Sequence, residues 1–187
     1  VVFAKGKFRG GGMTACKHGN GRDWWLIMGE SNHNTFDKFL VTSDSVSGPY
    51  RQSIGPAYLL PYDLAYSTFS EDGSKYVTGA VNGDVTVFDF DRCTGNLDNP
   101  LIIFNNVSTD STLPFSGSAS MAFSPNGRFL YVSANLNLNQ YDLWASNIQD
   151  SIRIYTADSN DHRGVGFLEL APDGRLFASC WNGGSHY

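Results

Sequence analysis

The chain has 187 residues, a formal net charge of −5 and 41% hydrophobic residues. This length and hydrophobic content are enough for one domain with a buried core. The acidic balance, together with the lack of any run of Lys or Arg, argues against a nucleic-acid-binding surface. No apolar stretch reaches the roughly 18 residues that a membrane-spanning helix requires, so we expect no direct membrane insertion.

A turn that ends in glycine occurs four times, and each time a cation and an apolar run follow it. The glycines lie 47 to 54 residues apart, and they are Gly21, Gly73, Gly127 and Gly174. A glycine accepts the positive φ that closes a tight hairpin, so we assign these four residues to structural turns. A period of this size, built from short strands, indicates the blades of a β-propeller.

Each unit has the same order of predicted strands. The first strand enters the glycine turn, at residues 13–17, 66–70, 120–124 and 167–171. The second strand leaves that turn, at residues 24–29, 76–80, 129–133 and 176–180. The third strand alternates apolar and polar residues, at 36–41, 85–90 and 139–144. The fourth strand is predicted at residues 50–54, 100–105 and 152–156.

The predicted fold class is all-β, a β-propeller of four-stranded antiparallel blades. Whole blades are expected at residues 13–64, 65–117 and 118–166, and part blades at 1–12 and 167–187, with an outer strand of a preceding blade at 1–8. Three and a half blades cannot close a ring, because propellers close with about four to eight. We therefore expect a partial propeller that belongs to a larger, seven-bladed ring or closes with another chain.

Three segments carry a resemblance to known proteins. Residues 85–95 end in Asp-Arg-Cys-Thr-Gly and resemble the end of a WD-repeat blade. Residues 17–25 (Lys-His-Gly-Asn-Gly-Arg-Asp-Trp-Trp), 88–95 and 123–131 occur in an order similar to the propeller segment of large secreted Bacteroidetes proteins. Those proteins commonly carry a sorting domain for type IX secretion. The resemblance implies an exported, cell-surface or outer-membrane-associated protein of uncharacterised role, and it implies a disulfide from Cys93 to a cysteine further downstream.

The densest polar cluster consists of His18, Arg22 and Asp23. One interpretation is a ligand-binding or acid/base site at the inner rim of a blade, near the central channel. The alternative is structural: Asp23 pairs with Arg22 or caps the turn, while Trp24 and Trp25 pack between blades. We favour the structural interpretation, because polar groups beside strand turns usually bond to backbone.

Asp89 and Asp91 lie on one face of a predicted strand. Two carboxylates could serve glycosidic chemistry, but a structural Asp that bonds backbone within the blade is the favoured interpretation. The four His residues lack metal-ligand spacing, and no Gly-x-Ser-x-Gly motif occurs. The sequence therefore predicts no catalytic residue, no metal and no cofactor.

The favoured function is a non-catalytic binding or scaffold propeller that mediates protein or glycan interactions. Its expected partners are other proteins, the remaining blades of the parent chain or outer-membrane secretion components, and its expected contact loops are residues 105–117 and 135–139. A second hypothesis is a carbohydrate-acting hydrolase or lyase, or a lactonase, with its site at the propeller channel. A third is an accessory component of the type IX secretion or gliding apparatus.

Overall fold

The computed structural model describes residues 6–31, 33–57, 65–80, 85–104, 118–134, 137–156 and 165–180. Blade I consists of β1 (Phe8–Lys17), β2 (Trp24–Glu30), β3 (Thr35–Val41) and β4 (Val46–Ser53). Blade II consists of β5 (Ala65–Phe69), β6 (Lys75–Ala80), β7 (Val85–Asp91) and β8 (Asn96–Phe104). Blade III consists of β9 (Ser118–Phe123), β10 (Phe129–Ala134), β11 (Asn137–Asp142), the short 3₁₀ helix η1 (Gln149–Ser151) and β12 (Arg153–Thr156). The half blade IV consists of β13 (Val165–Leu170) and β14 (Leu176–Cys180).

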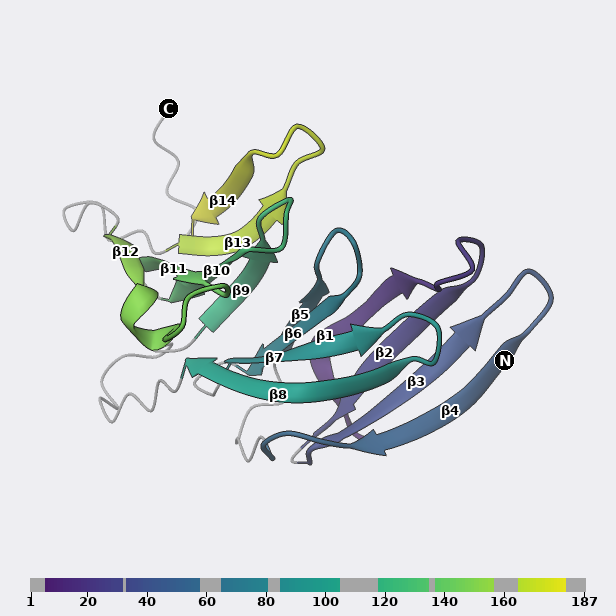
Figure 1. The fold of residues 1–187 in the computed structure, drawn as a ribbon. Helices are drawn as coiled ribbons and strands as arrows, with labels where there is room; N and C mark the ends of the chain where they lie inside the picture. The colour runs from purple at the N-terminus through teal and green to yellow at the C-terminus, as the bar shows by residue number, and fades with distance from the viewer. Residues whose placement is uncertain are drawn as a thin grey trace.

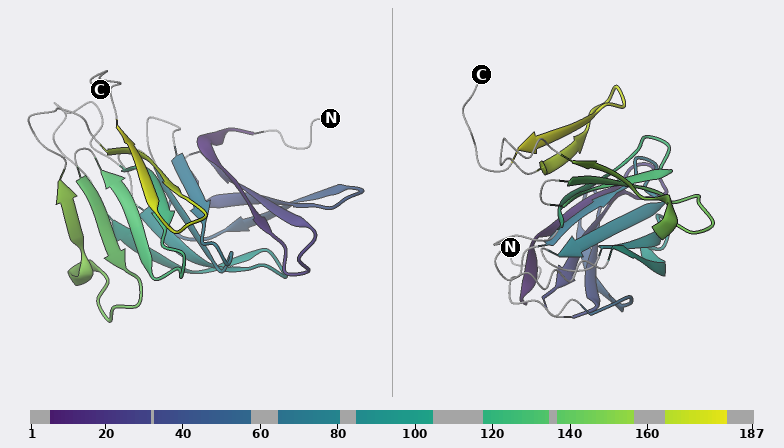
Figure 2. Two further views of the ribbon diagram at one scale, coloured as in Figure 1. Left: turned by 90° about the horizontal axis from the view of Figure 1, so that it is seen from above. Right: turned by 90° about the vertical axis from the view of Figure 1, so that its left-hand side faces the viewer.

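The strands of each blade pair antiparallel in chain order. The first strands of successive blades lie beside one another, β1 against β5, β5 against β9 and β9 against β13. The sheets therefore follow one another around a set of inner strands (Figures 1 and 2). The prediction of an all-β fold built from four-stranded antiparallel blades is confirmed. Within the described ranges, no helix is long and apolar enough to cross a membrane.

The four glycine turns share one geometry. In each turn the glycine N–H donates to the carbonyl oxygen three residues earlier, at 2.8 to 2.9 Å, and the glycine φ lies between 67° and 81°. The residue just before each glycine is Asn or Asp. Its side-chain oxygen accepts a hydrogen bond from the backbone N–H of the residue just after the glycine, at 3.0 to 3.2 Å. This Asx bond fixes the turn from the side chain, and glycine tolerates the positive φ that follows. The repeated sequence pattern is therefore a repeated backbone structure.

Two apolar clusters hold the blades together. The cluster between blades I and II is aromatic, with the Phe36 ring 5.5 Å from Phe88 and 6.0 Å from Tyr76. The cluster between blades II and III is largely aliphatic, and its buried members include Val77, Val85, Ile103, Leu130 and Val132. Burying these side chains is the main favourable contribution to blade packing, at about 25 cal/mol for each Å² of apolar surface.

β1 is longer than the sequence predicts. It begins at Phe8 rather than at Met13, and the register shifts between those two residues. The three glycines in this stretch did not indicate a strand, because glycine is depleted in strands. Gly11 lets β1 approach blade II, since a Cβ at that position would lie 2.6 Å from the Ala65 carbonyl oxygen. The outer strand expected at residues 1–8 lies mostly outside the described residues, and Phe8 itself belongs to β1.

β11 lies two residues earlier than predicted, because it begins at Asn137 rather than at Asn139 and ends at Asp142 rather than at Trp144. The Asp142 side chain accepts the backbone N–H of Trp144 at 3.0 Å, which turns the chain toward η1. Asp142 N–H in turn donates to Ser151 Oγ at 2.9 Å. An acidic residue that bonds its own backbone two residues on favours a turn over continued strand.

The expectation that Trp24 and Trp25 pack between blades holds for Trp25 and stays a prediction for Trp24, which no described blade covers. Trp25 is 4% exposed and faces blade II, whereas Trp24 is 46% exposed. Successive side chains of a strand point to opposite faces, so the two rings cannot share one interface. Trp24 lies on the face of blade I that points away from blade II.

Candidate binding site

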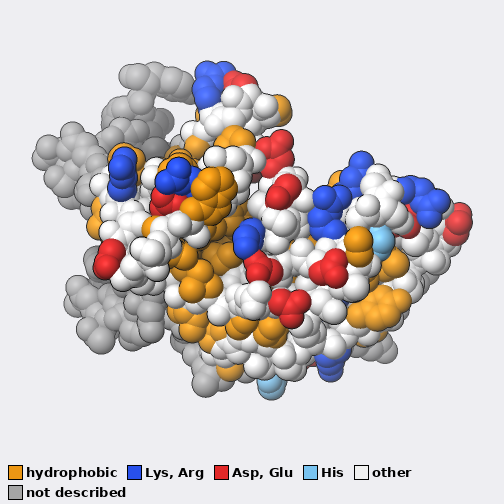
Figure 3. All heavy atoms as spheres, viewed as in Figure 1, with side chains coloured by type: hydrophobic (Ala, Val, Ile, Leu, Met, Phe, Trp, Pro, Cys, Tyr) orange, Lys and Arg blue, Asp and Glu red, His pale blue; other side chains and the backbone are white. Residues whose placement is uncertain are grey.

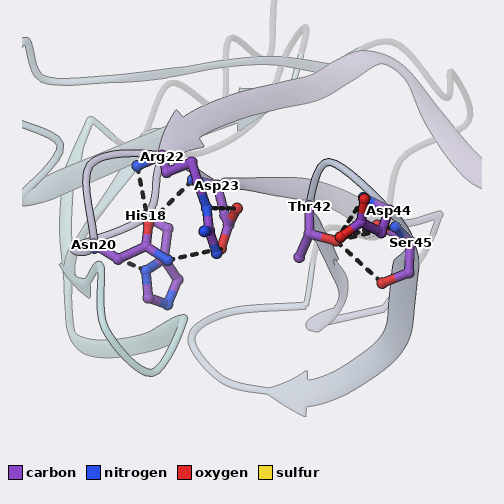
Figure 4. A network of polar contacts seen from close by, with 7 residues as sticks. All are labelled: His18, Asn20, Arg22, Asp23, Thr42, Asp44 and Ser45. Carbon is purple, nitrogen blue, oxygen red and sulfur yellow. Dashed lines mark hydrogen bonds and ion pairs between the residues drawn. The ribbon is translucent and has the colours of Figure 1, made fainter.

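The β1–β2 turn carries the three residues predicted as a ligand-binding cluster, His18, Arg22 and Asp23 (Figure 4). Asn20 connects them, since its side-chain amide donates to Asp23 Oδ2 at 2.7 Å and its backbone N–H donates to His18 Nδ1 at 3.0 Å. Because Nδ1 accepts a hydrogen bond, the ring proton lies on Nε2, which donates to the Cys93 carbonyl oxygen at 3.1 Å. The His18 ring therefore holds backbone groups of two neighbouring blades.

Asp23 is occupied by its own turn. Its side chain is 6% exposed, and Oδ1 accepts a hydrogen bond from Arg22 Nε at 3.0 Å. The hydrogen bonds from Arg22 and then from Asn20 lower the pKa of Asp23 below its usual range. A carboxylate held ionised by its donors is poorly suited to act as a general base near neutral pH. The Asp23 carboxylate is thus bonded to two side chains of its own turn.

Arg92, in the β7–β8 turn of blade II, clamps the two blades together. Its guanidinium donates to three backbone carbonyl oxygens, Lys17 at 2.9 Å, Asp72 at 2.8 Å and His18 at 3.4 Å. The Arg92 carbonyl oxygen accepts the indole N–H of Trp25 at 3.0 Å. The β1–β2 turn thus rests on the outer pair of strands of blade II, and the cluster of His18, Arg22 and Asp23 belongs to this junction.

Asp91 and Asp89 have different roles. The Asp91 side chain accepts the Cys93 N–H at 2.8 Å and the Thr94 hydroxyl at 2.7 Å, so it caps the β7–β8 turn. The Thr94 and Cys93 donors lower the pKa of Asp91. Asp89 pairs with Lys75 and accepts a hydrogen bond from Asn99 at 2.7 Å. Neither carboxylate lines either of the two cavities described below.

The thiols of Cys16 and Cys93 are free, the first buried and the second exposed. Cys93 therefore has no disulfide partner among the side chains that the structure describes. The downstream partner implied by the sequence resemblance stays a prediction.

An open groove lies between blades I and II, beside the junction. Its volume is about 520 Å³, and Trp25, Lys38, Tyr50, Gln52, Asn96 and Asp98 line it. We call it the interblade groove. The His18 ring stacks on Trp25 with centroids 5.8 Å apart, and Tyr50 meets Trp25 edge-on at 5.9 Å. One wall is thus aromatic, whereas the floor and the blade II rim are polar.

A second cavity, of about 700 Å³, lies against the inner strands β5, β9 and β13. We call it the inner-strand cavity, and Phe69, Glu71, Met121, Phe123, Leu168 and Glu169 are among its lining residues. Figure 3 shows hydrophobic side chains gathered between β13 and β7, with acidic side chains beside them. The residues of the β1–β2 turn do not line this cavity.

In the described part of the chain, no group of three or more His, Cys, Asp or Glu residues is arranged to hold a metal ion. The contact loop predicted at residues 105–117 lies outside the described residues, as do residues 135 and 136 of the other.

Sequence reasoning missed the residues that build the groove and the clamp. Arg92 stands in a turn, where a cation normally indicates a solvated surface. Lys38 stands at a position of β3 where the alternation calls for an apolar side chain, and this break in pattern was the available signal. Gln52 lies on another strand, β4, and no sequence pattern indicated that it bonds to Lys38 and to the Leu97 backbone.

No protein-family model and no curated protein sequence matches the chain. Solved β-propellers do match its fold. The β-propeller domain of Cps50 (Swd1) from Myceliophteria thermophila has a TM-score of 0.59 at 16% identity, over 90% of this chain and 50% of that one. A proposed 6-phosphogluconolactonase from Bacteroides uniformis has a TM-score of 0.51 at 20% identity, over 89% and 46%.

A luciferin-regenerating enzyme has a TM-score of 0.53 at 12% identity, over 89% of this chain and 52% of that one. This chain therefore spans about half the length of the solved structures that it resembles. Likeness at such low identity shows the fold alone, because one fold supports many functions. The chain has a β-propeller fold.

Proposed function

We propose that this chain is a non-catalytic binding and scaffold propeller, which holds protein or glycan partners on its blade surfaces. The observation that carries the proposal is a face of blade I that no described sheet covers. This end face consists of Met13, Trp24, Leu26, Met28 and Val41. Met13 is 61% exposed, and the other four are exposed or half-buried.

The strand register places these side chains on one surface. Met13 pairs with Met28, and Trp24 pairs with Val41, so these apolar side chains share one face of β1, β2 and β3, which also carries Lys17 and the ion pair of Asp37 with Arg51. The opposite face of the same strands is packed against blade II, where Ile27 is fully buried. Several exposed apolar side chains gathered on one side of a sheet favour an interaction site.

The occupant that we propose is a further propeller blade, a four-stranded antiparallel sheet with an apolar face. Blades II and III each present such a face to the blade before them, so the end face continues a repeated interface. This chain matches about half of a solved propeller, which supports the proposal that further blades complete the ring. We propose that the completed ring has seven blades, and that the remaining blades belong to the same polypeptide or to a partner protein.

A pair of tryptophan variants tests this role. Trp24→Asp puts a charge into the end face, whereas Trp144→Asp changes an equally large side chain that is 67% exposed on blade III. We expect Trp24→Asp to release the covering sheet, or to lower the free energy of unfolding by at least about 2 kcal/mol. The readouts are native mass by light scattering and denaturant unfolding. Equal behaviour of the two variants would refute the end face as an interface.

A second candidate is a carbohydrate-acting hydrolase or lyase, or a lactonase, with its site in the propeller channel. The inner-strand cavity favours it, because Glu71 and Glu169 line a cavity of sufficient size for a small ligand. Two of the solved propellers that this chain resembles are named as enzymes. Glu169→Gln and Glu71→Gln should then abolish turnover in a substrate screen while the melting temperature is retained. A screen in which the unmodified protein turns over no substrate argues for the scaffold.

We further propose that the protein acts outside the cytoplasm, at the cell surface or as an accessory of type IX secretion or gliding. The ordered motifs of residues 17–25, 88–95 and 123–131 support this proposal. Cell fractionation with an antibody to the native protein tests it. Recovery with outer-membrane proteins supports the accessory role, and recovery only in the cytoplasm contradicts it.

A further inference from the structure

We propose that the interblade groove binds a saccharide that carries a carboxylate, such as a hexuronate unit of an acidic polysaccharide. This inference rests on the binding role proposed above and names the ligand class. It uses the flank of blades I and II rather than the end face, so either proposal can fail alone. Its starting point is a lysine in an apolar position.

Lys38 is buried where the strand pattern calls for an apolar residue. It lies between Phe36 and Leu40 on the face of β3 that packs toward blade II, and it is 3% exposed. Burial lowers the pKa of Lys38, while the nearby carboxylate of Asp98 opposes that effect. A buried ammonium group costs free energy unless it is paired, and an aliphatic side chain would fill this position without that cost.

The ammonium group of Lys38 retains hydrogen-bonding capacity. Its Nζ donates to Gln52 Oε1 at 2.6 Å, the one hydrogen bond that it makes with the described residues. Gln52 is itself fixed to blade II, because Oε1 accepts the Leu97 N–H at 3.0 Å and Nε2 donates to the Leu97 carbonyl oxygen at 2.6 Å. An ammonium group has three N–H donors, so two remain for a ligand at the floor of the groove.

The charges around the groove favour a ligand with one negative charge. Arg51 is committed to Asp37 at 2.8 Å and to Glu30 at 2.7 Å, so it adds little free positive charge. Lys38 is thus the cation available at the floor, and Asp98 stands on the blade II side of the groove. A single carboxylate matches Lys38, whereas a phosphate dianion would meet too little positive charge and the repulsion of Asp98.

The remaining lining fits a sugar ring. Tyr50 is 48% exposed, and its edge-on contact with Trp25 holds the ring as an apolar surface against which a sugar face can pack. Asn96 and Asp98 on β8 supply an amide and a carboxylate that can bond to hydroxyl groups. The volume of about 520 Å³ lies within the range of small-ligand sites. A disaccharide with one carboxylate at the floor satisfies these features together.

Titration calorimetry of the purified protein with cellobiouronate, a disaccharide that carries one carboxylate, and with the neutral disaccharide cellobiose tests the proposal. We expect the acidic disaccharide to bind at least about tenfold more tightly, and Lys38→Met to remove that preference. Tyr50→Ala should weaken the binding of both sugars. Tyr155→Ala, which removes an equally exposed tyrosine from blade III, should change neither affinity.

The same binding measured at several salt concentrations tests the charge on the unmodified protein. This measurement remains valid even if Lys38→Met does not fold. Raising the ionic strength from about 0.05 M to about 0.5 M should weaken binding of the acidic disaccharide and leave the neutral one unchanged. Equal affinity for the two sugars, failure of both to bind, or a preference that persists in folded Lys38→Met would overturn the proposal.

Discussion

Trp24 and Tyr76 each lie three residues after the glycine of their turn, yet Trp24 is 46% exposed and Tyr76 is fully buried. Blade I covers Tyr76, whose ring lies 6.0 Å from Phe36. No described sheet covers the corresponding surface of blade I. Equivalent positions in a repeat therefore differ in burial because one of them lacks a neighbour, and this difference carries the proposed scaffold role.

A comparison of two turn glycines, Gly21 and Gly73, distinguishes the cost of backbone strain from that of steric overlap. Gly21 and Gly73 have nearly the same φ, 73° and 72°. A Cβ at Gly21 would meet nothing within 4 Å, whereas a Cβ at Gly73 would lie 2.5 Å from Cys16 Sγ. We expect Gly21→Ala to cost about 1 kcal/mol and Gly73→Ala about 3 kcal/mol, because only the second adds overlap to the strain of a positive φ. Urea unfolding measures both, and equal losses would contradict the close packing of the two blades.

Removal of the Arg92 clamp should loosen the junction of blades I and II. Arg92→Ala loses hydrogen bonds to three carbonyl oxygens, and we expect a loss of about 2 kcal/mol in the free energy of unfolding. Arg175→Ala is the matched control, because that side chain is 75% exposed and pairs only within its own turn. A loss no larger than that of the control would show that Arg92 does not join the blades.

Acid should weaken blade III through Asp142. The hydrogen bonds from Arg128, at 3.0 and 2.6 Å, lower the pKa of Asp142 in the folded state. Because the pKa of Asp142 is lower in the folded state than in the unfolded state, the ionised carboxylate stabilises the fold. This stabilisation is fully present above the unfolded-state pKa of about 4 and is lost as the pH falls through the folded-state pKa. Melting temperatures of wild type and Asp142→Asn should therefore differ at neutral pH and converge below about pH 4. A constant difference across that range would exclude this linkage.

The two described thiols should differ in reactivity. Cys93 is exposed and free, whereas Cys16 is 6% exposed and burial raises its pKa. We expect iodoacetamide to alkylate Cys93 in the native protein and Cys16 only after unfolding, because the thiolate is the reactive form. Peptide mapping assigns each modified cysteine. A Cys93 that labels only after reduction would support the downstream disulfide and contradict the free thiol.

The glycine turns made the blades predictable, because the chemistry of each turn is local. Asn20, Gly21 and Arg22 specify their turn with bonds that span two residues, so a single sequence contains the signal. β1 was predicted too short, because its glycines are explained by the approach to Ala65, a contact far along the chain. Local patterns therefore recovered the strands better than the contacts between blades.

The candidate site was less predictable for the same reason. The sequence identified His18 as a polar residue of interest, but its partner, the Cys93 carbonyl oxygen, lies 75 residues away. The interblade groove joins Lys38 and Gln52 of blade I to Asp98 of blade II. Such combinations depend on how sheets pack, and a periodic pattern within one strand does not record them.

Peroxide oxidation of the native protein, followed by peptide mapping, tests the scaffold role most directly. The rates at which the three methionines oxidise are compared. Met13 is 61% exposed at the end face, Met28 is half-buried next to Met13 on the same face, and Met121 is 5% exposed in the core. If a further blade covers the end face, Met13 oxidises as slowly as Met121 until the protein is unfolded. Rapid oxidation of Met13 in the native protein, with Met121 still protected, would contradict the proposed scaffold.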